Sequence, residues 1–430
     1  MKRLFGINSS LLFLIGISII FFAFIFLQSC KSPTEPISKG LSLKAADITC
    51  TEVWLNLNAN NIPLPVNVTI NKNDSLLFSI TLTTVDTIIY DNNLSPNKAY
   101  TYQAQSGNLK SETVTVNTLD TTSHSITWQK FVIGEFQSTL YDVWGTDENN
   151  VYATGIVRLN GNAYGMLHYD GNEWQPVSST GGYAIYGFGK NDIWTAGGGV
   201  FHFDGTTWKQ IDSKIVNSQA IPLDSILFYN TPYKAIWGTS SSNLYLVGGK
   251  GRVIYWNGSK ASIIYDYNDP NDFSFSDING TSTNNIWATG QKKSAFANLV
   301  FHYDGSLWRQ DNSVPFYQEV STTVFTPTYG QSIFGGVEVS IKKFDRWYNM
   351  IYPIGYVIGK IRGKSINDFF AVGDWGTVVH FNGLTWHYYS ELYTPSGGAN
   401  HGVFEIGNKI FVVGDNEDDI SAKIIIGTKQ

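Results

Sequence analysis

Between residues 43 and 120, short runs of alternating apolar and polar residues are separated by polar turns. Such alternation is typical of strands with one buried face. The runs occupy residues 51–57, 66–70, 77–82, 87–90, 100–105 and 111–116. About seven short strands in a segment of this size predict a sandwich of two antiparallel sheets. Trp54, on an early strand, is expected to be a core aromatic residue.

From about residue 123 the pattern becomes a repeat. Each unit contains a strand-like run that begins with a polar residue, usually Asn, and ends at Gly. The seven runs occupy residues 150–155, 191–197, 243–248, 285–290, 331–336, 367–373 and 408–414. Seven copies in 308 residues give a period of 44, which is typical of a four-stranded propeller blade. The sequence therefore predicts an all-β protein with a seven-bladed β-propeller at residues 123–430.

A second repeated phrase locates the outer two strands of each blade. It reads FHYDGSLW at residues 301–308, and it recurs around His168, His202 and His380. We expect the innermost strand to precede the Asn-started run, the His-aromatic pair to lie on the third strand, and the Trp to begin the fourth. The Asp-Gly or Asn-Gly dipeptide between the last two strands supplies the positive φ that a tight hairpin requires.

The seventh repeat is short of one strand. Residues 401–427 supply three strands, and no Trp-started strand follows them. A matching strand stands before the first repeat, because residues 125–131 correspond to residues 383–389. We therefore expect this N-terminal strand to complete the seventh blade, which removes an open sheet edge and closes the ring.

The first 29 residues are predicted to be a signal peptide. A positively charged pair, Lys2-Arg3, precedes an apolar run over residues 11–26, and the sequence LQSC ends at Cys30. A small residue directly before Cys resembles the bacterial lipobox, in which the Cys is lipidated and becomes the new N-terminus. A transmembrane anchor is the alternative interpretation of the apolar run.

Cys30 is therefore the predicted lipidation site, and residues 30–42 form a predicted polar tether. Each buried CH₂ of an acyl chain contributes about 0.8 kcal/mol, so two or three chains hold a protein on a membrane. The predicted location is the bacterial cell envelope, at the outer membrane, with the side that the protein faces left open.

Composition narrows the classes of partner. The net charge is −6 and there is no long basic run, so nucleic acid is not an expected partner.

The chain has two Cys residues. If Cys30 carries lipid, Cys50 has no disulfide partner within the chain, and we expect it to be a small buried apolar residue rather than a catalytic thiol. The protein is expected to be a monomer.

Ligand binding is expected on one face of the propeller. The turns between the first and second strands, and between the third and fourth, are short and uniform, whereas the other connections vary in length and form the expected binding face. The candidate ligand-binding residues are Tyr229, Tyr233, Tyr265, Tyr267, Phe296, Tyr317, Tyr393, Arg158 and Arg252. Aromatic side chains suit sugar rings and peptide side chains, so the expected ligand is a glycan or a protein. The alternative for each aromatic residue is that it packs the loops against the ring.

Four His residues resemble a set of metal ligands in the sequence. His168, His202, His302 and His380 occupy the same position in four predicted blades. The third strand lies about 10 Å outside the innermost one, so these side chains are too far apart to meet the short bonds, about 2.1 Å, that zinc makes with nitrogen. We interpret them as packing residues with satisfied ring nitrogens.

An acidic loop offers a second metal candidate. Asp415, Glu417, Asp418 and Asp419 could hold calcium, which prefers several oxygen ligands, although the spacing is not that of an EF-hand. A solvated acidic loop is the preferred interpretation, so no cofactor is expected.

Catalysis remains the alternative function. The sequence contains no Gly-x-Ser-x-Gly, His-Glu-x-x-His or phosphate-binding Gly loop. The Asp-Gly-x-x-Trp phrase is one residue shorter than the Asp-box of sialidase-like propellers. Carboxylates paired across blades are invisible in sequence, so a polysaccharide hydrolase or lyase with its site at the propeller axis stays open beside binding or scaffolding. Two or three carboxylates or an Arg cluster in a deep axial pocket would favour the enzyme, and a broad aromatic surface would favour binding.

Two resemblances extend these predictions. The run LSPNKAYTY at residues 94–102 resembles the tyrosine corner of fibronectin type III modules, which implies that Leu94 fills the core and Tyr100 bonds to the backbone. Residues 45–430 are similar to uncharacterised exported lipoproteins of the Bacteroidetes–Ignavibacteria type, which join such a module to repeats of the NDIWAVG…HYDGxxW kind. This resemblance implies a fibronectin type III-like domain at residues 43–120 and a propeller at the cell surface or in the periplasm. It implies no chemistry.

Overall fold

The computed structural model describes residues 40–211, 233–269, 271–295, 297–314, 322–350, 353–416 and 421–430. These residues form β-strands joined by turns and short 3₁₀ helices, so the all-β prediction is confirmed. No helix in this part of the chain is long and apolar enough to span a membrane. The signal peptide and several predicted site residues lie outside the described residues: Cys30, Tyr229, Phe296, Tyr317, Glu417, Asp418 and Asp419.

The chain divides into two compact units. One contains the first strand up to Lys44 together with Leu55–Ile89 and Tyr100–Thr115. The other contains Ala45–Trp54, Tyr90–Ala99 and Val116–Gln430.

Eight strands precede residue 120, and they form two sheets. They are β1 (Gly40–Ile48), β2 (Val53–Asn60), β3 (Val66–Lys72), β4 (Ser75–Leu82), β5 (Asp86–Asp91), β6 (Ala99–Ser106), β7 (Leu109–Lys110) and β8 (Val114–Asn117). One sheet has the order β1-β2-β5, and the other has the order β4-β3-β6-β7 with β8 paired to β6. Trp54 and Leu94 are buried, as the sequence predicted, and Tyr100 is buried as well. Strand β1 begins at Gly40, inside the segment that was predicted as tether.

Seven four-stranded antiparallel sheets follow in the described part of the second unit. The first sheet consists of β10 (Thr139–Asp147), β11 (Asn150–Leu159), β12 (Asn162–Tyr169) and β13 (Trp174–Ser178). The second consists of β14 (Ala184–Gly189), β15 (Asp192–Ala196), β16 (Val200–Phe203) and β17 (Trp208–Gln210). The third consists of β18 (Tyr233–Ser240), β19 (Asn243–Gly248), β20 (Arg252–Trp256) and β21 (Ala261–Asp266). The next three are β22 (Phe273–Ser282), β23 (Asn285–Lys292), β24 (Ala297–Tyr303) and β25 (Trp308–Gln310); β26 (Thr323–Phe325), β27 (Gln331–Gly335), β28 (Val339–Lys343) and β29 (Arg346–Met350); and β30 (Ile358–Ser365), β31 (Asp368–Gly373), β32 (Val378–Phe381) and β33 (Trp386–Tyr388). The last is β34 (Asn400–Ile406), β35 (Lys409–Asn416), β36 (Ser421–Lys429) and β9 (Ile126–Ile133).

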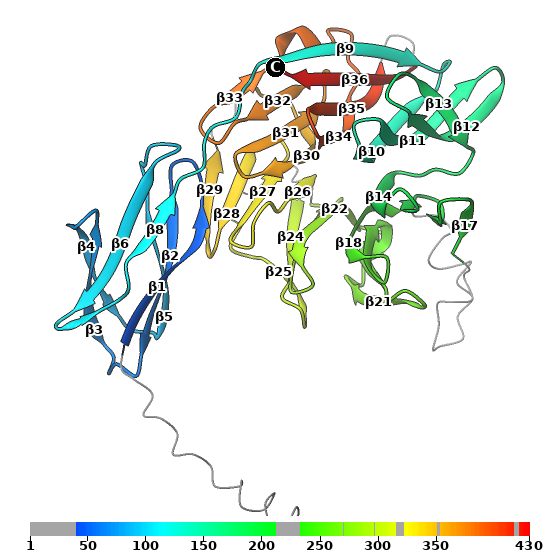
Figure 1. Ribbon diagram of the computed structural model, residues 1–430. Helices are drawn as coiled ribbons and strands as arrows, with labels where there is room; N and C mark the ends of the chain where they lie inside the picture. Colours follow the sequence, from blue (N-terminus) through cyan, green and yellow to red (C-terminus); the bar gives the residue numbers. More distant parts are fainter. Residues whose placement is uncertain are drawn as a thin grey trace, which may run out of the picture. The chain divides into compact units, whose positions relative to one another are not determined.

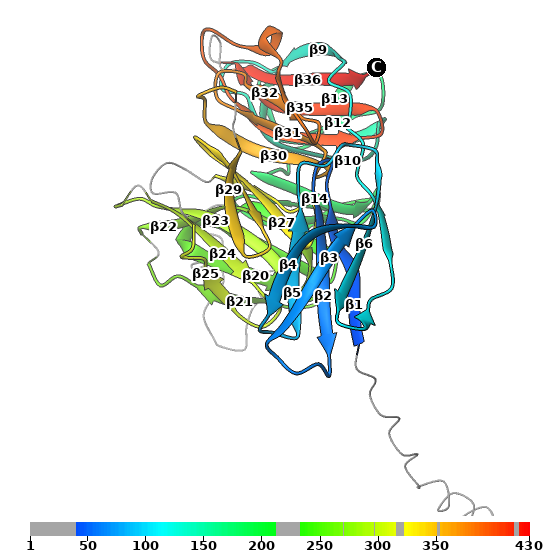
Figure 2. The ribbon, with the colours of Figure 1, turned by 90° about the vertical axis from the view of Figure 1, so that its left-hand side faces the viewer.

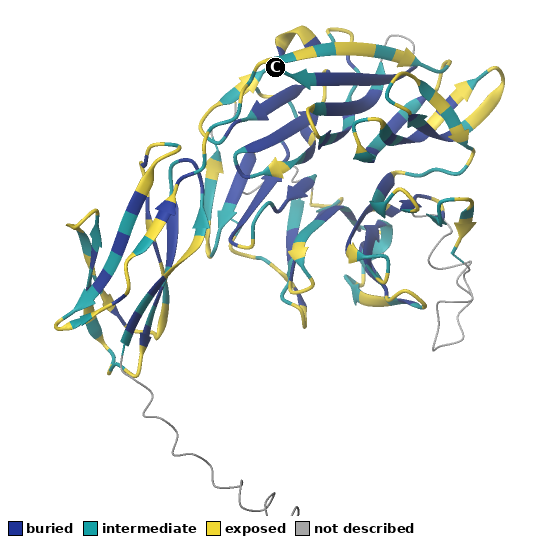
Figure 3. Ribbon diagram, in the orientation of Figure 1, coloured by how far each residue is buried: buried dark blue, intermediate teal, exposed yellow. Residues whose placement is uncertain are grey.

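The sheets of this unit share a common centre. In Figure 1, β10, β14, β18, β22, β26, β30 and β34 lie innermost, one from each sheet. Each of these strands contacts the innermost strand of the next sheet, and β34 contacts β10. Apolar side chains fill the space between neighbouring sheets; for example, Leu140 and Val143 of the first sheet share a core with Phe411 and Val413 of the last. Figure 3 shows the middle strands largely buried and the turns exposed.

The predicted pairing of the N-terminal strand is confirmed. Strand β9 pairs antiparallel with β36, from Ile133 opposite Ala422 to Ile126 opposite Lys429. The two strands lie side by side in both views (Figures 1 and 2). The first strand of the repeat region therefore supplies the outermost strand of the last sheet.

The second strand of every sheet lies where the Asn-started runs predicted it, from β11 to β35. Two of the connections expected to vary in length, at residues 156–165 and 291–298, consist largely of strand. β11 and β12 extend to a tight turn at Asn160 and Gly161, and β23 pairs with β24 as far as Lys292 and Ala297. Backbone hydrogen bonding across the hairpins continues beyond the repeated sequence.

The repeated His residues form one recurring contact. Each ring Nε2 lies 2.7–3.0 Å from a side-chain oxygen at the start of the second strand: His168 with Asn150, His202 with Asp192, His302 with Asn285 and His380 with Asp368. Each ring also packs on the aromatic residue two positions further along: Tyr152, Trp194, Trp287 and Phe370. Burial lowers the pKa of His168 and of His302. The interpretation of these residues as framework is confirmed.

The Asp-Gly turns are framework too. Asp304 Oδ1 accepts the backbone N–H groups of Ser306 and Leu307, and Gly305 has a φ of 92°. Asp170, Asp204 and Asn382 make the same pair of bonds in their own turns. The carboxylate or amide thus replaces a backbone acceptor and holds the third and fourth strands together.

Cys50 is fully buried and unpaired, as predicted. Its thiol donates to the carbonyl oxygen of Asp120 at 3.2 Å. Burial raises the pKa of the thiol to about 11, so at neutral pH it is not a nucleophilic thiolate.

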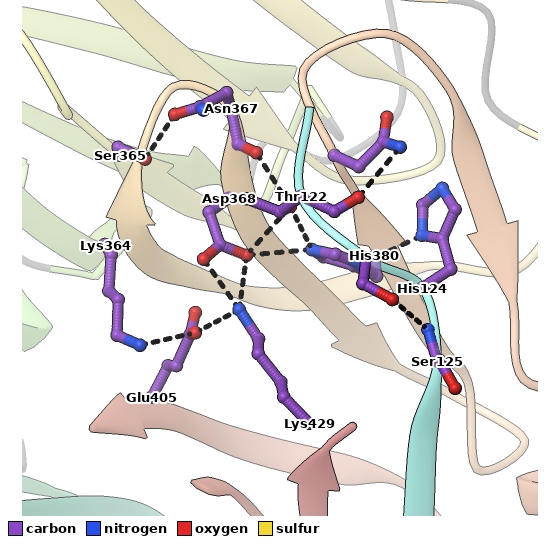
Figure 4. A network of polar contacts seen from close by, with 12 residues as sticks. Thr122, His124, Ser125, Lys364, Ser365, Asn367, Asp368, His380, Glu405 and Lys429 are labelled. Carbon is purple, nitrogen blue, oxygen red and sulfur yellow. Dashed lines mark hydrogen bonds and ion pairs between the residues drawn. The ribbon is translucent and has the colours of Figure 1, made fainter. Parts of the chain in front are cut away.

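The segment before β9 is held by a polar network (Figure 4). His124 Nδ1 lies 2.9 Å from His380 Nδ1, and His380 Nε2 lies 2.9 Å from the Asp368 carboxylate. Asp368 also receives Lys429, whose ammonium is shared with Glu405. His387 stacks on His124, and the Tyr389 hydroxyl donates to the His124 carbonyl. The network ties the last two sheets to the chain that enters β9.

This network predicts an acid-sensitive contribution to stability. Burial, with His380 and His387 close by, lowers the pKa of His124 to about 4 from a reference of 6.5. The unfolded chain therefore binds a proton at a higher pH than the folded chain does, and the stability contribution present above about pH 6.5 is lost as the pH falls toward about 4. We expect the urea midpoint of unfolding to fall across this window, and to fall less in His124→Gln. Equal slopes in the two chains would contradict the assignment to His124.

Candidate binding site

Three predicted aromatic ligand residues, which lie on or next to the third sheet, pack against side chains of the neighbouring sheets. Tyr233 is 6% exposed and belongs to the core between the second and third sheets. Tyr265 packs against Phe301, and Tyr267 packs against Phe273 with ring centroids 4.3 Å apart. Tyr233 therefore corrects the prediction, because the space between neighbouring sheets must be filled and large rings fill it. Tyr265 and Tyr267 are half-buried, so their role in ligand binding stays a prediction.

The predicted arginines behave differently from each other. Arg252 Nε donates to the Asp266 carboxylate at 2.8 Å, across the pair formed by β20 and β21. That ion pair uses the Nε–H, and Nη1 is buried without a hydrogen-bond partner among the described residues, so a role of Arg252 in ligand binding stays a prediction. Arg158 is exposed on the extended β11–β12 hairpin.

Asp415 is the one candidate metal ligand of the acidic loop that the structure describes, and its carboxylate already has hydrogen-bond partners. Its carboxylate accepts the Ala399 N–H at 3.0 Å and the His401 ring at 2.8 Å. Burial alone would raise the pKa of Asp415, but these two partners hold it below its ordinary value. Over the residues that the structure describes, no three His, Cys, Asp or Glu side chains are grouped so that they could hold a metal ion.

Tyr393 belongs to a partly exposed aromatic group. Its ring stacks on Tyr356, with centroids 6.0 Å apart and planes 21° apart, and Tyr356 lies next to Trp375 at 6.2 Å. We call these three residues the Trp375 platform. Trp375 is in the β31–β32 connection, Tyr356 precedes β30, and Tyr393 follows the 3₁₀ helix η3 (Ser390–Leu392). All three therefore lie on the face with the variable connections, which we call the long-loop face.

Trp375 is held in a strained and exposed conformation. Its φ is 59° and its side chain is 41% exposed. A bulky residue in this left-handed region is disfavoured by about 1–2 kcal/mol, and such strain tends to occur at functional sites. The Asp374 and Thr394 N–H groups fix the loop through the carbonyls of Val357 and Trp375. Gly376 follows at a φ of 69°, and a Cβ there would lie 2.5 Å from Thr394 Oγ1. The backbone around the indole is thus rigid.

A second group continues the long-loop face toward the first sheet. Asp374 bridges to Ala399, which precedes β34. His401 on β34 pairs with Asp415 and lies beside Tyr141, whose ring stacks at 4.6 Å on Tyr183. Burial raises the pKa of Asp374, with His401 opposing and Asp415 adding to the shift. The face therefore combines flat rings with carboxyl and imidazole groups, which suits a ligand that has both apolar faces and hydrogen-bonding groups.

A separate cavity of about 240 Å³ lies at the common centre of the sheets. All seven innermost strands line it, with charged side chains from Asp142, Lys360, Arg362 and Glu405 and aromatic ones from Trp144, Tyr186, Phe325 and Phe404. The volume is below the range of about 300–1,000 Å³ that small-molecule sites usually have. We call it the axial cavity.

Asp277 lies behind the two cations of the axial cavity, Lys360 and Arg362, and pairs with both. Its carboxylate, 1% exposed, receives Arg362 Nη2 at 2.8 Å, Lys360 Nζ at 3.1 Å and the Thr323 hydroxyl at 2.7 Å. Burial alone would raise the pKa of Asp277, but Arg362 and Lys360 hold it well below its ordinary range. Asp277 is therefore a permanent anion that joins the fourth sheet to the fifth and sixth.

Asp142 occupies on β10 the position that Asp277 occupies on β22. No cation lies within ion-pair distance of it in the described residues. Its oxygens accept the N–H groups of Val143 at 3.0 Å and of Ile185 at 3.1 Å. Burial raises the pKa of Asp142 in spite of Lys360 and Arg362 nearby. The two equivalent carboxyl groups thus differ in their readiness to take a proton.

Comparison with known proteins bears on the fold. No family model and no curated protein matches the chain. Among solved structures, the chain is similar to one described as "YCF48 bound to D1 peptide", with a TM-score of 0.51 and 14% identity over 70% of this chain and 95% of that chain. That protein is a β-propeller, so the likeness shows the β-propeller fold in the present chain.

Sequence reasoning missed most of these residues. Trp375 and Tyr356 were not among the candidates, although a Trp outside the repeated positions, flanked by Asp and Gly, was a usable signal. The innermost strands containing Asp142 and Asp277 were recognised as strands, but Lys360 and Arg362 were not connected with them. Asp142 and Asp277 share one position of the repeat, but no local pattern connects them with Lys360 and Arg362, which both come from β30.

Proposed function

We propose that the protein is a lipid-anchored protein of the bacterial cell envelope that binds a partner through the long-loop face of a seven-bladed β-propeller. In this proposal a fibronectin type III-like domain stands between the lipid anchor and the propeller. The observation that carries the binding role is the Trp375 platform, a rigid and exposed aromatic surface.

The seven-bladed ring is supported by three features of the second unit. The unit has seven four-stranded sheets, one cavity lined by all seven innermost strands, and a contact between the first and last of these strands. Pairing of β9 with β36 would act as the closure that joins the two ends of the repeat region.

The fibronectin type III-like assignment is supported by sheet order. A three-stranded sheet of the first, second and fifth strands, opposite a sheet built on the third, fourth and sixth, is the arrangement that such a sandwich requires. The lipid anchor is supported by the LQSC sequence ending at Cys30, and metabolic labelling of the protein with palmitate tests it.

A protein ligand is the first choice for the platform. The similar propeller is one bound to a peptide, and flat aromatic side chains are over-represented where proteins contact each other. A glycan is the alternative that the same rings would suit.

Catalysis is the second candidate function, and Asp142 is the observation that favours it. A carboxyl group with a raised pKa in a cavity is what a general acid requires. The other carboxylates weigh against an acid–base pair, because Asp277 is bound by Arg362 and Lys360, and Glu405 is bound by Lys364 and Lys429. The small size of the cavity also weighs against a polysaccharide chain.

Replacing Trp375 with Ala tests the binding role. We expect the lipid-free chain from residue 31 to bind members of a peptide array or a glycan array, and Trp375→Ala to weaken that binding at least about tenfold, since central aromatic residues dominate interfaces. The melting temperature should stay within about 2 °C, because the side chain is exposed and Ala, which also has a Cβ, keeps the same backbone strain.

Tyr329 provides the matched control. It is 68% exposed and lies in a turn on the opposite face, so Tyr329→Ala should bind normally. Equal binding by the Trp375→Ala chain, or turnover of a glycosidic substrate without binding to either array, would contradict the proposed function.

A further inference from the structure

The axial cavity has an unusual balance of charge. Asp142, Asp277, Lys360 and Arg362 form a neutral set when all are ionised, and Glu405 belongs to a second neutral set with Asp368, Lys364 and Lys429. Asp277 lies behind the two cations and can neutralise one of them. One positive charge therefore faces the cavity, and Asp142 is the group that remains to balance it.

Lys360 has unused hydrogen-bonding capacity. Within the described residues its ammonium makes one hydrogen bond, to Asp277 Oδ1 at 3.1 Å. An ammonium has three N–H donors, so two are available to a molecule in the cavity. Arg362 is more fully engaged, because its Nη atoms also donate to the carbonyls of Val324 and Ile361.

Asp142 can act as the second polar partner, beside Lys360, of a molecule in the cavity. Each of its oxygens already accepts one backbone N–H, which fixes the carboxyl group in place. In its protonated form it would present an O–H donor, as one member of a carboxyl pair does when two such groups share a proton. The remaining wall combines the apolar rings of Trp144, Phe325 and Phe404 with the polar groups of Tyr186, Asn279 and Glu405.

We propose that the axial cavity binds a single carboxylate group attached to a short apolar moiety, with the Lys360 ammonium as its cationic donor and Asp142 as its proton-sharing partner. When Asp142 is protonated, the cavity holds one unbalanced positive charge, which matches a monoanion and not a phosphate dianion. About 240 Å³ accommodates a short-chain carboxylic acid or the last residue of a peptide. This site is distinct from the Trp375 platform and does not depend on the proposed function.

Proton uptake is the signature of this arrangement. The charged and titratable groups that face Asp142 are Lys360, Arg362, Glu405 and Tyr186. A bound carboxylate adds a negative charge beside Asp142 and favours its protonated form, so binding and protonation strengthen each other. The affinity should fall as the pH rises.

Calorimetric titration with sodium propionate tests the proposal on the lipid-free chain from residue 31. We expect binding at about pH 5.5, at least tenfold weaker binding at about pH 7.5, and proton uptake seen as a dependence of the heat on buffer. Propionamide, which lacks the charge, should not bind. A short peptide with a free C-terminus and its C-terminal amide distinguish the two sources: a preference for the free acid assigns a chain end, and binding of propionate alone assigns a free acid.

Three variants separate the roles. Lys360→Gln should weaken propionate binding at least about tenfold, while Asp142→Asn, whose amide still donates, should retain binding but lose proton uptake. Lys209→Gln, on the exposed surface, is the matched control and should bind as the parent chain does. Absence of propionate binding at about pH 5.5, equal binding of propionamide, or unchanged binding and proton uptake in both cavity variants would each overturn the proposal. If Lys360→Gln does not fold, the Asp142→Asn titration decides alone. None of these measurements involves the Trp375 platform, so this proposal and the proposed function can fail separately.

Discussion

A chain that lacks residues 123–131 is expected to melt about 10 °C below the parent chain. The deletion removes six of the eight residues of β9 and exposes the edge of β36. Trp128 packs in the core between the last two sheets, and Phe131 packs in the core between the first and the last. The half-buried apolar side chains of this strand together contribute on the order of 3–6 kcal/mol. For a domain of this size each kcal/mol corresponds to roughly 2–4 °C. Differential scanning calorimetry measures the change.

A deletion of equal length in the predicted tether is the matched control. Removing residues 31–39 shortens the chain by the same nine residues without touching β9. The control should melt as the parent does. If both deletions leave the melting temperature unchanged, β9 does not stabilise the last sheet and the closure is wrong.

Replacing Asp277 with Ala is expected to destabilise the protein by about 3–5 kcal/mol, because it leaves two buried cations without their partner. Lys360 and Arg362 both donate to this carboxylate, and their side chains are largely buried. The Thr323 hydroxyl and the Val324 N–H also lose their acceptor. Urea unfolding of the variant, monitored by tryptophan fluorescence, gives the free energy.

A triple variant separates charge from packing. Asp277→Leu combined with Lys360→Met and Arg362→Met removes the whole cluster and fills similar volume, so its stability should lie within about 1–2 kcal/mol of the parent. A single Asp277→Ala change that costs less than about 1 kcal/mol would show that water in the axial cavity already compensates the cations, contrary to this account.

The repeated framework was predictable because its contacts are local. Each His reaches a polar residue at the start of the neighbouring strand, 10 to 18 residues away, and each Asp-Gly turn closes on itself. Contacts of this kind recur with the chain's own period and leave a pattern of polar and aromatic positions. The register of the strands and the place of β9 followed from that pattern.

The candidate sites were not predictable in the same way. Asp277 meets Arg362 across 85 residues of sequence, and Tyr356 meets both Trp375 and Tyr393 from other connections. Each contact occurs once, so no repetition marks it. Tyr233 illustrates the opposite error, because residue type alone does not distinguish a ring that packs between sheets from one that faces solvent.

The sequence by itself determined the all-β class, the seven repeated units, the supply of the last strand from the start of the repeat region, and the framework role of the His and Asp-Gly residues. It did so because these properties depend on alternation along a strand and on hydrogen bonds between neighbours in the chain. Only the tertiary structure decided that Asp142, Asp277, Lys360 and Arg362 share one centre, and that Trp375 is a rigid exposed ring beside Tyr356 and Tyr393. Those facts depend on which side chains converge when seven separate sheets are brought around an axis. Burial and the neighbouring cations then shift the pKa values of Asp142 and Asp277 in opposite directions.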